Sequence, residues 1–400
     1  MTPLYSEHGQ TILCGDCLRI LPTFDAERFS TVITDPPYGL GFMGKTWDRG
    51  VPGVPFWEEI MRVCKPGAFL LAFGGTRTFH RLTCAIEDAG WEIKDCVLWL
   101  YGQGFPKSLN IGKSIDKAAG AEREILGKRT DGRYANGFSE AAKRATGNAW
   151  KENQGFVGEM GVITAPATDL AREFDGWETA LKPAWEPIIV AMKPLDGTFA
   201  QNAQRHGVAG MNIDGGRIGF DRPAMAKVSN GTPREFLRSE GRAVVGTQSG
   251  GRWPANVLLD EEAAALLDEQ SGVLTSNSGT LTHKNGVQRN AFGKYGACAS
   301  AGISDSGGAS RFFYTAKASK SDRGAGNDHP TVKPIALMKY LCTLTATPTG
   351  GEILDPFGGS MTTLVAAREC GRLATAIELD EKNCRIGIKR LGQGVLFGAA

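Results

Sequence analysis

The chain has 400 residues, of which 42% are apolar and 22% are charged. This balance is typical of globular proteins and excludes a wholly disordered chain, and at about 100–200 residues per domain the length predicts two or three domains. The 45 basic and 43 acidic side chains give a net charge of +2, which neither requires nor excludes a polyanionic partner.

The sequence contains no segment typical of a membrane or exported protein. The longest apolar run, residues 68–73, is far shorter than the about 20 residues that a membrane helix needs. The first ten residues, MTPLYSEHGQ, have no basic stretch before an apolar core, so no secretory signal is visible. We therefore expect a cytoplasmic protein without a membrane partner, whose nine cysteines are reduced thiols.

The N-terminal part of the sequence alternates between strand-like and helix-like segments. Apolar and β-branched runs predict strands, and apolar residues that recur every three or four positions predict helices. We expect Lys65-Pro66-Gly67 to end the first of these helices. The expected strands are residues 11–14, 31–34, 68–73, 97–100 and 187–192, and the expected helices are residues 56–63 and 79–86.

The C-terminal part repeats this alternation. Helices are expected over residues 335–344, 362–369 and 380–391, and strands over residues 352–354 and 373–377. Strands that alternate with helices predict an α/β fold, in which helices cover both faces of a parallel sheet.

Two long stretches between these parts, residues 103–180 and 196–325, are rich in Gly, Asn, Ser, Thr and Arg and have weak periodicity. Within the second, residues 258–267 are typical of a helix with an acidic first turn. Residues 284–333 contain eight Lys or Arg and three Asp, a local charge of +5. Insertions of this kind are commonly binding elements, so we interpret residues 196–325 as a substrate-contacting region; a solvated surface stretch is the alternative.

The first motif is Asp35-Pro36-Pro37-Tyr38, directly after the strand over residues 31–34. Consecutive prolines lack N–H donors and fix the backbone, so the segment is stiff and leaves its carbonyl groups free to accept hydrogen bonds. A carboxylate and a phenol ring flank these carbonyls, so the segment can hold an amino group while the ring stacks on a flat heterocycle. The carboxyl end of a strand is also where open α/β sheets bind ligands.

The second motif is a strand, a glycine-rich turn and a helix start, residues 353–360 with the sequence ILDPFGGS. This arrangement is common at sites for nucleotide-like ligands. About 20 residues later Glu378 ends the next strand, which suits hydrogen bonding to the two hydroxyls of a ribose. The alternative for this acidic segment is a helix N-terminus, which fits Asp380 better than Glu378.

Two further segments carry polar groups near predicted strand or helix ends. Gly15-Asp16-Cys17 places a carboxylate after the first strand, and residues 329–334, HPTVKP, present a hydroxyl and an ammonium before a helix. Cys14 and Cys17 have the spacing of a C-x-x-C pair. No second pair or nearby histidine accompanies them, so we expect no metal site.

The order of these motifs resembles the S-adenosylmethionine (SAM)-dependent DNA amino-methyltransferases. DPPY ahead of the glycine-rich turn is similar to their β group, in which the motif order is circularly permuted. GDCLRIL near the start and HPTVKP before the turn strengthen the resemblance, which covers residues 10–102, 182–195 and 326–392. One position departs from the pattern, because Met361 stands where the family usually has glycine.

The resemblance implies roles for individual residues. Asp35 and the Pro36 carbonyl would accept hydrogen bonds from the target amino group, and Tyr38 would stack on the flipped base. Asp16 would contact the adenine of the cofactor, Glu378 its ribose, and Thr331 and Lys333 its methionine carboxylate. The implied catalytic residues are Asp35, Pro36, Pro37 and Tyr38, and the implied cofactor-binding residues are Asp16, Cys17, Asp35, Thr331, Lys333, Asp355, Phe357, Gly359, Ser360, Thr362 and Glu378.

The resemblance also implies a Rossmann-like methyltransferase fold with a mostly parallel, seven-stranded, circularly permuted sheet and an inserted target-recognition region. The implied parts are a catalytic half (10–102), an insertion (103–180), a strand of the same sheet (181–195), the target-recognition region (196–325) and a cofactor-binding half (326–392).

The function implied by the resemblance is site-specific methylation of adenine N6 in duplex DNA. The N4 amino group of cytosine is the first alternative, because family members with that target more often carry Ser at the position of Asp35. RNA methylation and a catalytically silent DNA-binding protein are remoter alternatives. A nicotinamide oxidoreductase would leave the DPPY motif unexplained. The implied location is the nucleoid of a bacterial or phage-infected cell, and a homodimer or a separate restriction endonuclease is compatible with this function.

Overall fold

The computed structural model describes residues 2–41, 50–102, 104, 108–128, 162–219, 251–276, 281–282, 288–290, 293–295, 299–300, 305–317, 322, 324, 327 and 332–393. The chain divides into two compact units. One consists of Met1–Gly102 and Trp185–Ala400, and the other of Gln103–Ala184. Thr331 lies outside the described residues.

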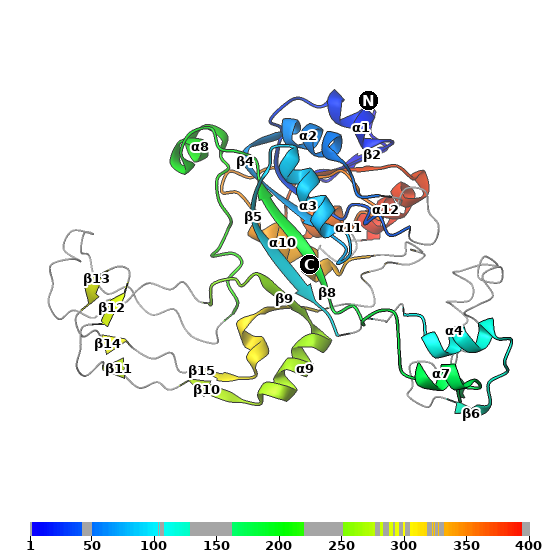
Figure 1. Cartoon of the computed structure of the whole chain (residues 1–400). Coiled ribbons are helices and arrows are strands. Elements are labelled where there is room, and N and C mark those ends of the chain that lie inside the picture. Colours follow the sequence, from blue (N-terminus) through cyan, green and yellow to red (C-terminus); the bar gives the residue numbers. More distant parts are fainter. Residues whose placement is uncertain are drawn as a thin grey trace. The chain divides into compact units, whose positions relative to one another are not determined.

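The larger unit is built on one mixed, mostly parallel sheet (Figure 1). Only β1 and β8 run antiparallel to their neighbours in it. The strands in spatial order are β1 (Tyr5–Glu7), β2 (Gln10–Cys14), β18 (Ala374–Glu378), β17 (Ile353–Asp355), β3 (Phe29–Thr34), β4 (Cys64–Phe73), β8 (Trp185–Met192), β5 (Glu92–Leu100), β9 (Val257–Asp260) and β16 (Tyr314–Ala316).

The predicted number of seven strands was wrong, because ten strands pair in this sheet. The strands from β2 to β5 include one antiparallel strand, β8, as expected, but β1 extends one edge and β9 and β16 extend the other. Both β9 and β16 come from residues 196–325, the expected target-recognition region. Strands this short carry little apolar pattern of their own, and the neighbouring strand decides their conformation.

The boundary between β9 and the following helix was also misplaced. Residues 258–267 were predicted as one helix, but Val257–Asp260 is a strand and α9 (Glu261–Ser271) begins after it. The carboxylate of Asp260 accepts a hydrogen bond from the backbone N–H of Ala263 at 2.7 Å. This N-cap fixes where the helix starts.

Helices pack on both faces of the sheet because neighbouring residues of each strand point to opposite sides. Val32 belongs to a core with α2 (Val54–Val63) and α3 (Phe79–Asp88). Its neighbour Ile33 belongs to a second core with α10 (Ile335–Leu344) and α11 (Thr362–Glu369). The two-sided covering predicted from the alternating sequence is therefore present.

The segment after α2, which was expected to end this helix, has a different role. The helix ends at Val63, but Lys65-Pro66-Gly67 already belongs to β4. Gly67 has φ +75°, and a Cβ atom there would lie 2.6 Å from Asn202 Nδ2. This segment therefore lets α8 (Phe199–His206) approach the strand closely.

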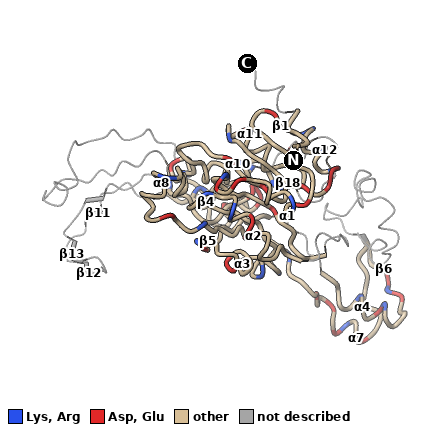
Figure 2. The backbone as a smooth tube through the Cα atoms, turned by 90° about the horizontal axis from the view of Figure 1, so that it is seen from above, with Lys and Arg blue, Asp and Glu red and all other residues tan. Residues whose placement is uncertain are grey.

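The smaller unit, described by itself, contains α4 (Ile111–Ala118), α7 (Asp169–Glu173) and the antiparallel strands β6 (Ile125–Lys128) and β7 (Val162–Thr164). The buried carboxylate of Asp116 accepts hydrogen bonds from Thr168 and Ala167 and pairs with Arg123 at 2.6 Å. Basic and acidic residues are interspersed along this unit (Figure 2).

The remaining elements are α1 (Cys17–Ile20), α12 (Glu381–Gln393), the 3-10 helices η1 (Leu21–Thr23) and η4 (Ala309–Phe312), and the strands β10 (Leu274–Ser276), β11 (Leu281–Thr282), β12 (Gln288–Asn290), β13 (Gly293–Tyr295), β14 (Ala299–Ser300) and β15 (Asp305–Gly307). Of these, α1 and η1 contribute Ile20 and Leu21 to the core with α2 and α3, and α12 contributes Leu391 to the core with α10 and α11. Among the described residues, no helix has the length and apolar character needed to cross a membrane.

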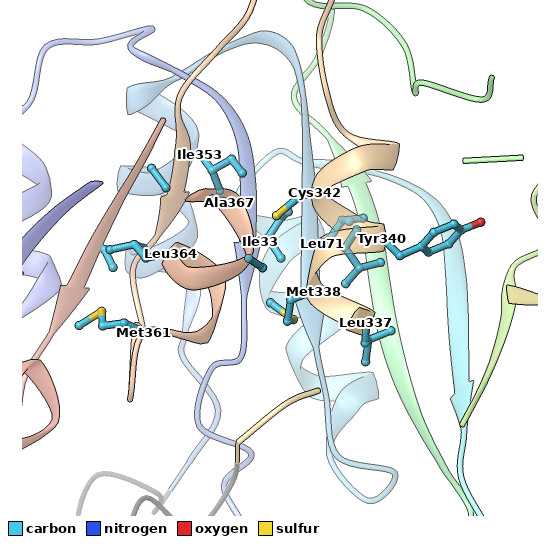
Figure 3. Packing of buried hydrophobic residues seen from close by; sticks show 14 of the residues in the cluster. Ile33, Leu71, Leu337, Met338, Tyr340, Cys342, Ile353, Met361, Leu364 and Ala367 are labelled. Carbon is cyan, nitrogen blue, oxygen red and sulfur yellow. The ribbon is translucent and has the colours of Figure 1, made fainter. Parts of the chain in front are cut away.

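Met361, the residue that departs from the family pattern, is part of the core with α10 and α11 (Figure 3). It is fully buried and has φ +64°, a left-handed conformation that favours glycine. Its side chain occupies the space beside Gly358 and contacts Gly387 of α12. The methionine thus packs on the helix side of the turn.

Replacing Met361 by glycine tests whether the backbone strain or the packing of the buried side chain has the larger effect on stability. The Met361→Gly change relieves about 1 kcal/mol of backbone strain but deletes a buried side chain, and Met→Ala changes in cores cost about 2–5 kcal/mol. We expect a net loss of about 1–4 kcal/mol in the free energy of unfolding, measured by urea denaturation. The exposed Leu373→Ala is the control. Unchanged or increased stability of Met361→Gly would contradict this packing role.

Candidate active site

A pocket of about 640 Å³ lies at the carboxyl ends of β2, β3, β17 and β18. Parallel strands end at the same edge of a sheet, so the loops that follow them form the pocket walls. Its volume lies within the usual range for small-molecule sites. Every predicted site residue that the structure describes lines this pocket, namely Asp16, Cys17, Asp35, Pro36, Pro37, Tyr38, Lys333, Asp355, Phe357, Gly359, Ser360, Thr362 and Glu378.

Asp355, at the end of β17, is a buried carboxylate that fixes the glycine-rich turn. It accepts hydrogen bonds from the hydroxyls of Thr34 at 2.7 Å and Thr363 at 2.5 Å, and from the backbone N–H of Phe357 at 3.2 Å. Burial raises the pKa of Asp355 to about 6, although these hydrogen bonds oppose the shift. The side chain therefore joins β3, β17 and α11 behind the pocket wall.

Glu378, at the end of β18, is fixed by backbone donors on both of its oxygens. Oε2 accepts from Gly359 N–H at 2.8 Å and Oε1 accepts from Asp380 N–H at 2.8 Å. Burial raises the pKa of Glu378 above its ordinary value. Because the carboxylate is both fixed and part of the pocket lining, it is suited to bind the hydroxyl groups of a ligand.

Arg390 of α12 also fixes the glycine-rich turn between Asp355 and Glu378. Its guanidinium donates to the Ser360 carbonyl at 2.6 Å and to the Thr362 hydroxyl at 2.9 Å. Phe357 lies in the same turn, with its ring centroid 5.9 Å from that of Phe56. The pocket thus has a rigid polar wall and an apolar aromatic wall.

Asp16 and Cys17 begin α1 at the end of β2. The Asp16 carboxylate accepts a hydrogen bond from Leu18 N–H at 3.0 Å and caps this short helix. Burial raises the pKa of the Cys17 thiol to about 12. A thiol that stays protonated is a poor nucleophile, so Cys17 contributes apolar surface to the pocket.

The segment Asp35–Tyr38 follows β3 and forms the opposite part of the pocket. The Tyr38 hydroxyl donates to Asp35 Oδ1 at 2.8 Å and lies 3.2 Å from Glu186 Oε2. Burial and the two carboxylates raise the pKa of Tyr38 well above its ordinary value. The Thr78 hydroxyl donates to the Tyr38 carbonyl at 2.6 Å, and a Cβ atom on Gly75 would lie 3.1 Å from the tyrosine ring. The phenol is therefore fixed on several sides.

Lys333, just before α10, reaches the same group of side chains. Its ammonium lies 2.9 Å from Asp35 Oδ2, 3.0 Å from Glu186 Oε2 and 3.0 Å from the Tyr38 hydroxyl. Burial alone would lower the pKa of Lys333, but Asp35 and Glu186 raise it above its ordinary value. The expected role at a methionine carboxylate stays a prediction, since the described contacts of this ammonium are with the DPPY segment and Glu186.

Three residues of the site were missed from the sequence: Glu186, Arg390 and Trp99, which also lines the pocket. Glu186 is an acid inside an otherwise apolar strand, and this could have been noticed as a signal. Arg390 sits in a helix where charged residues are ordinary, and Trp99 resembles any strand aromatic. Nothing local in the sequence distinguishes the last two.

Comparisons with known proteins place these features in a family. A profile of the DNA methylase family matches residues 29–389. The type II methyltransferase M2.LlaDCHI of Lactococcus lactis subsp. cremoris is 39% identical over 79 residues, which are 20% of this chain and 29% of that protein. The DNA adenine methyltransferase YhdJ of Escherichia coli (strain K12) is 41% identical over 64 residues, which are 16% of this chain and 21% of that protein.

The crystal structure of the M1.HpyAVI–SAM complex aligns with a TM-score of 0.40 at 13% identity, covering 95% of this chain and 99% of that one. The chain matches well under half of the length of the two curated relatives.

The raised pKa of Asp355 makes the stability of the fold depend on pH. Between pH 3.8 and about 6, Asp355 keeps a proton in the folded protein that it releases in the unfolded chain. The free energy of unfolding therefore falls as pH rises through this range. Asp355→Asn loses an acceptor at every pH but has no carboxylate to ionise. The destabilisation that it causes should therefore be about 2 kcal/mol smaller at pH 7 than at pH 4.

Urea denaturation of the wild type and Asp355→Asn at both pH values measures this difference. The exposed Asp88→Asn serves as the control for the general effect of removing an acid. An equal loss of stability at pH 4 and pH 7 would show that Asp355 is not a buried, proton-holding group.

Proposed function

The chain belongs to the DNA methylase family, and from this we propose that it transfers a methyl group from SAM to the N6 amino group of adenine in duplex DNA. The observation that carries the proposal is the single pocket in which the Asp35–Tyr38 segment and the Glu378-anchored turn both take part. One part of this pocket is chemically suited to an amino group and the other to a nucleoside.

The residues of the second part fit SAM. A nucleoside needs acceptors for its ribose hydroxyls and its adenine amino group, together with a flat apolar wall. Glu378 and Asp16 supply carboxylates, and Phe357 with Phe56 supplies the aromatic surface. Ser360 and Thr362 border the same space, held in place by Arg390.

These residues receive the following roles in the proposal. Glu378 binds the ribose hydroxyls, Asp16 accepts from the adenine amino group, and Phe357 and Cys17 form apolar surface. Asp355 acts indirectly, because its oxygens already accept hydrogen bonds from Thr34, Thr363 and Phe357. The segment around Gly359 and Ser360 borders the remaining part of the cofactor. When bound, SAM would supply an electrophilic methyl group on its sulfonium.

The DPPY segment would activate the target nitrogen. An exocyclic amino group conjugated to its ring is a weak nucleophile. Asp35 and the Pro36 carbonyl would accept hydrogen bonds from its N–H groups, which biases the nitrogen towards tetrahedral geometry and exposes its lone pair. Tyr38 would stack on the base, which has to leave the DNA helix at a cost of a few kcal/mol. No covalent link between protein and base is needed.

Adenine is proposed ahead of cytosine because Asp35 occupies the first position of the motif, where family members acting on cytosine N4 more often have serine. The relative YhdJ, named a DNA adenine methyltransferase, agrees with this choice over its matched segment. We assign DNA recognition to the residues of the 196–325 region that do not belong to β9, α9 or β16. Lys and Arg side chains there would contact phosphates and guanine edges.

The product can be identified by nucleoside mass spectrometry. The purified protein is incubated with SAM and unmethylated DNA of varied sequence, and the DNA is then digested completely. We expect N6-methyladenine. N4-methylcytosine would retain the mechanism and contradict the choice of base. If neither methylated base is found in DNA, whether or not RNA is methylated, the proposed function is contradicted.

Variants in the two parts of the pocket should have different effects, one on methyl transfer and the other on SAM binding. Asp35→Ala should abolish methyl transfer and leave the Kd for SAM within about threefold of wild type, since Asp35 acts on the base. Glu378→Gln should weaken SAM binding roughly 10–100-fold, because a hydrogen bond to a charged group is worth about 1.5–3 kcal/mol.

Calorimetric titration with SAM and a methyl-transfer assay measure the two effects separately. Glu381→Gln is the matched control, because that exposed acid pairs only with Arg385 among the interactions described for it. Near-normal turnover of Asp35→Ala would exclude the proposed activation of the amino group.

A further inference from the structure

We propose that Lys333 and Glu186 are positioning residues for the DPPY segment: the ammonium of Lys333, oriented by Glu186, fixes the Asp35 carboxylate in place as an acceptor for the target amino group. This inference rests on the proposed function, because it assigns the same pocket. It differs from the role at the cofactor carboxylate that the sequence resemblance implied for Lys333.

The first argument is the count of donors on Lys333. An ammonium has three N–H donors and no acceptor. Asp35 Oδ2, Glu186 Oε2 and the Tyr38 hydroxyl lie at 2.9, 3.0 and 3.0 Å from Nζ. These three acceptors match the three donors, so a cofactor carboxylate would have to displace one of them.

The second argument is enclosure. The Lys333 side chain is only 8% exposed, and its Nζ lies 4.8 Å from the ring centroid of Phe73 in the core. The same Nζ lies 5.4 Å from the ring centroid of Tyr38. A lysine held between two aromatic rings and two carboxylates has little freedom to reach another part of the pocket.

The third argument is charge. Asp35 and Glu186 approach the same phenol oxygen, at 2.8 and 3.2 Å, and two negative charges this close repel each other. Lys333 lies between them and offsets this repulsion. Without this cation the Asp35 carboxylate would be pushed away from the position in which it can accept from the amino group.

Other titratable groups around this cluster are few among the described residues. Asp355 at the end of β17 is affected by the charge of Asp35, and Tyr101 after β5 by those of Glu186 and Lys333. Neither of them supplies a positive charge. Of these groups, Lys333 is therefore the one that can hold the carboxylates of Asp35 and Glu186 together.

The test compares kcat and the Kd for SAM in Lys333→Met, Glu186→Gln and the double variant. Lys333→Met should lower kcat at pH 7 roughly 100-fold, because the Asp35 carboxylate loses the cation that fixes it. Its Kd for SAM should stay within about threefold of wild type. Glu186→Gln should lower kcat less, roughly tenfold, since Lys333 keeps its contact with Asp35.

The double variant should recover roughly tenfold of the activity lost in Lys333→Met, because it removes the carboxylate that repels Asp35. A purely structural role for Lys333 predicts no such recovery. Lys339→Met, on the exposed side of α10 and paired with Glu369, is the matched control and should behave as wild type. Should Lys333→Met fail to fold, Lys333→Arg and Glu186→Gln decide the same question: Lys333→Arg keeps a cation beside Asp35 and should retain kcat within about tenfold of wild type.

A kcat within about threefold of wild type in both Lys333→Met and Glu186→Gln would overturn the inference. So would a large rise in the Kd for SAM in Lys333→Met, which would place the ammonium at the cofactor. Wild-type protein that methylates no DNA would instead contradict the proposed function. The SAM affinities need no turnover and would still decide between the two positions of Lys333.

Discussion

The parallel pairing of β3 with β17, joined by the hydrogen bond from the Thr34 hydroxyl to the buried Asp355 carboxylate, is the interaction on which the site depends. These two residues are 321 positions apart in the sequence. Because both strands end at the same edge, the DPPY segment and the glycine-rich turn face one pocket. Without this pairing the two motifs would be separate loops.

The two sides of this junction are rigid for different physical reasons. On the β17 side, backbone N–H groups fix Glu378, and Arg390 donates to the Ser360 carbonyl. Met361 in the same turn has a left-handed backbone conformation and a fully buried side chain. On the β3 side, charge does most of the fixing, since one ammonium is shared by two carboxylates and a phenol. A pre-organised site of this kind needs little rearrangement to bind flat, polar ligands.

The sequence was sufficient for the local features and insufficient for the distant ones. Strands such as Phe29–Thr34 and the turn at residues 355–360 follow from apolar runs and glycine spacing, and the motifs indicated the pocket walls. The strands β9 and β16 could not be predicted, because pairing with neighbouring strands decides the conformation of such short segments. Glu186 and Lys333 are 147 positions apart, and no pattern in either segment indicates that they meet at Asp35.

A crystal structure of the protein with S-adenosylhomocysteine, the demethylated product of the cofactor, tests the central claim most directly. The account predicts the ribose hydroxyls at Glu378, the adenine between Phe357 and the loop after β2, and the thioether sulfur facing Asp35 and Pro36. A ligand bound outside this pocket, or one whose sulfur points away from the DPPY segment, would contradict the claim that one pocket holds both donor and target.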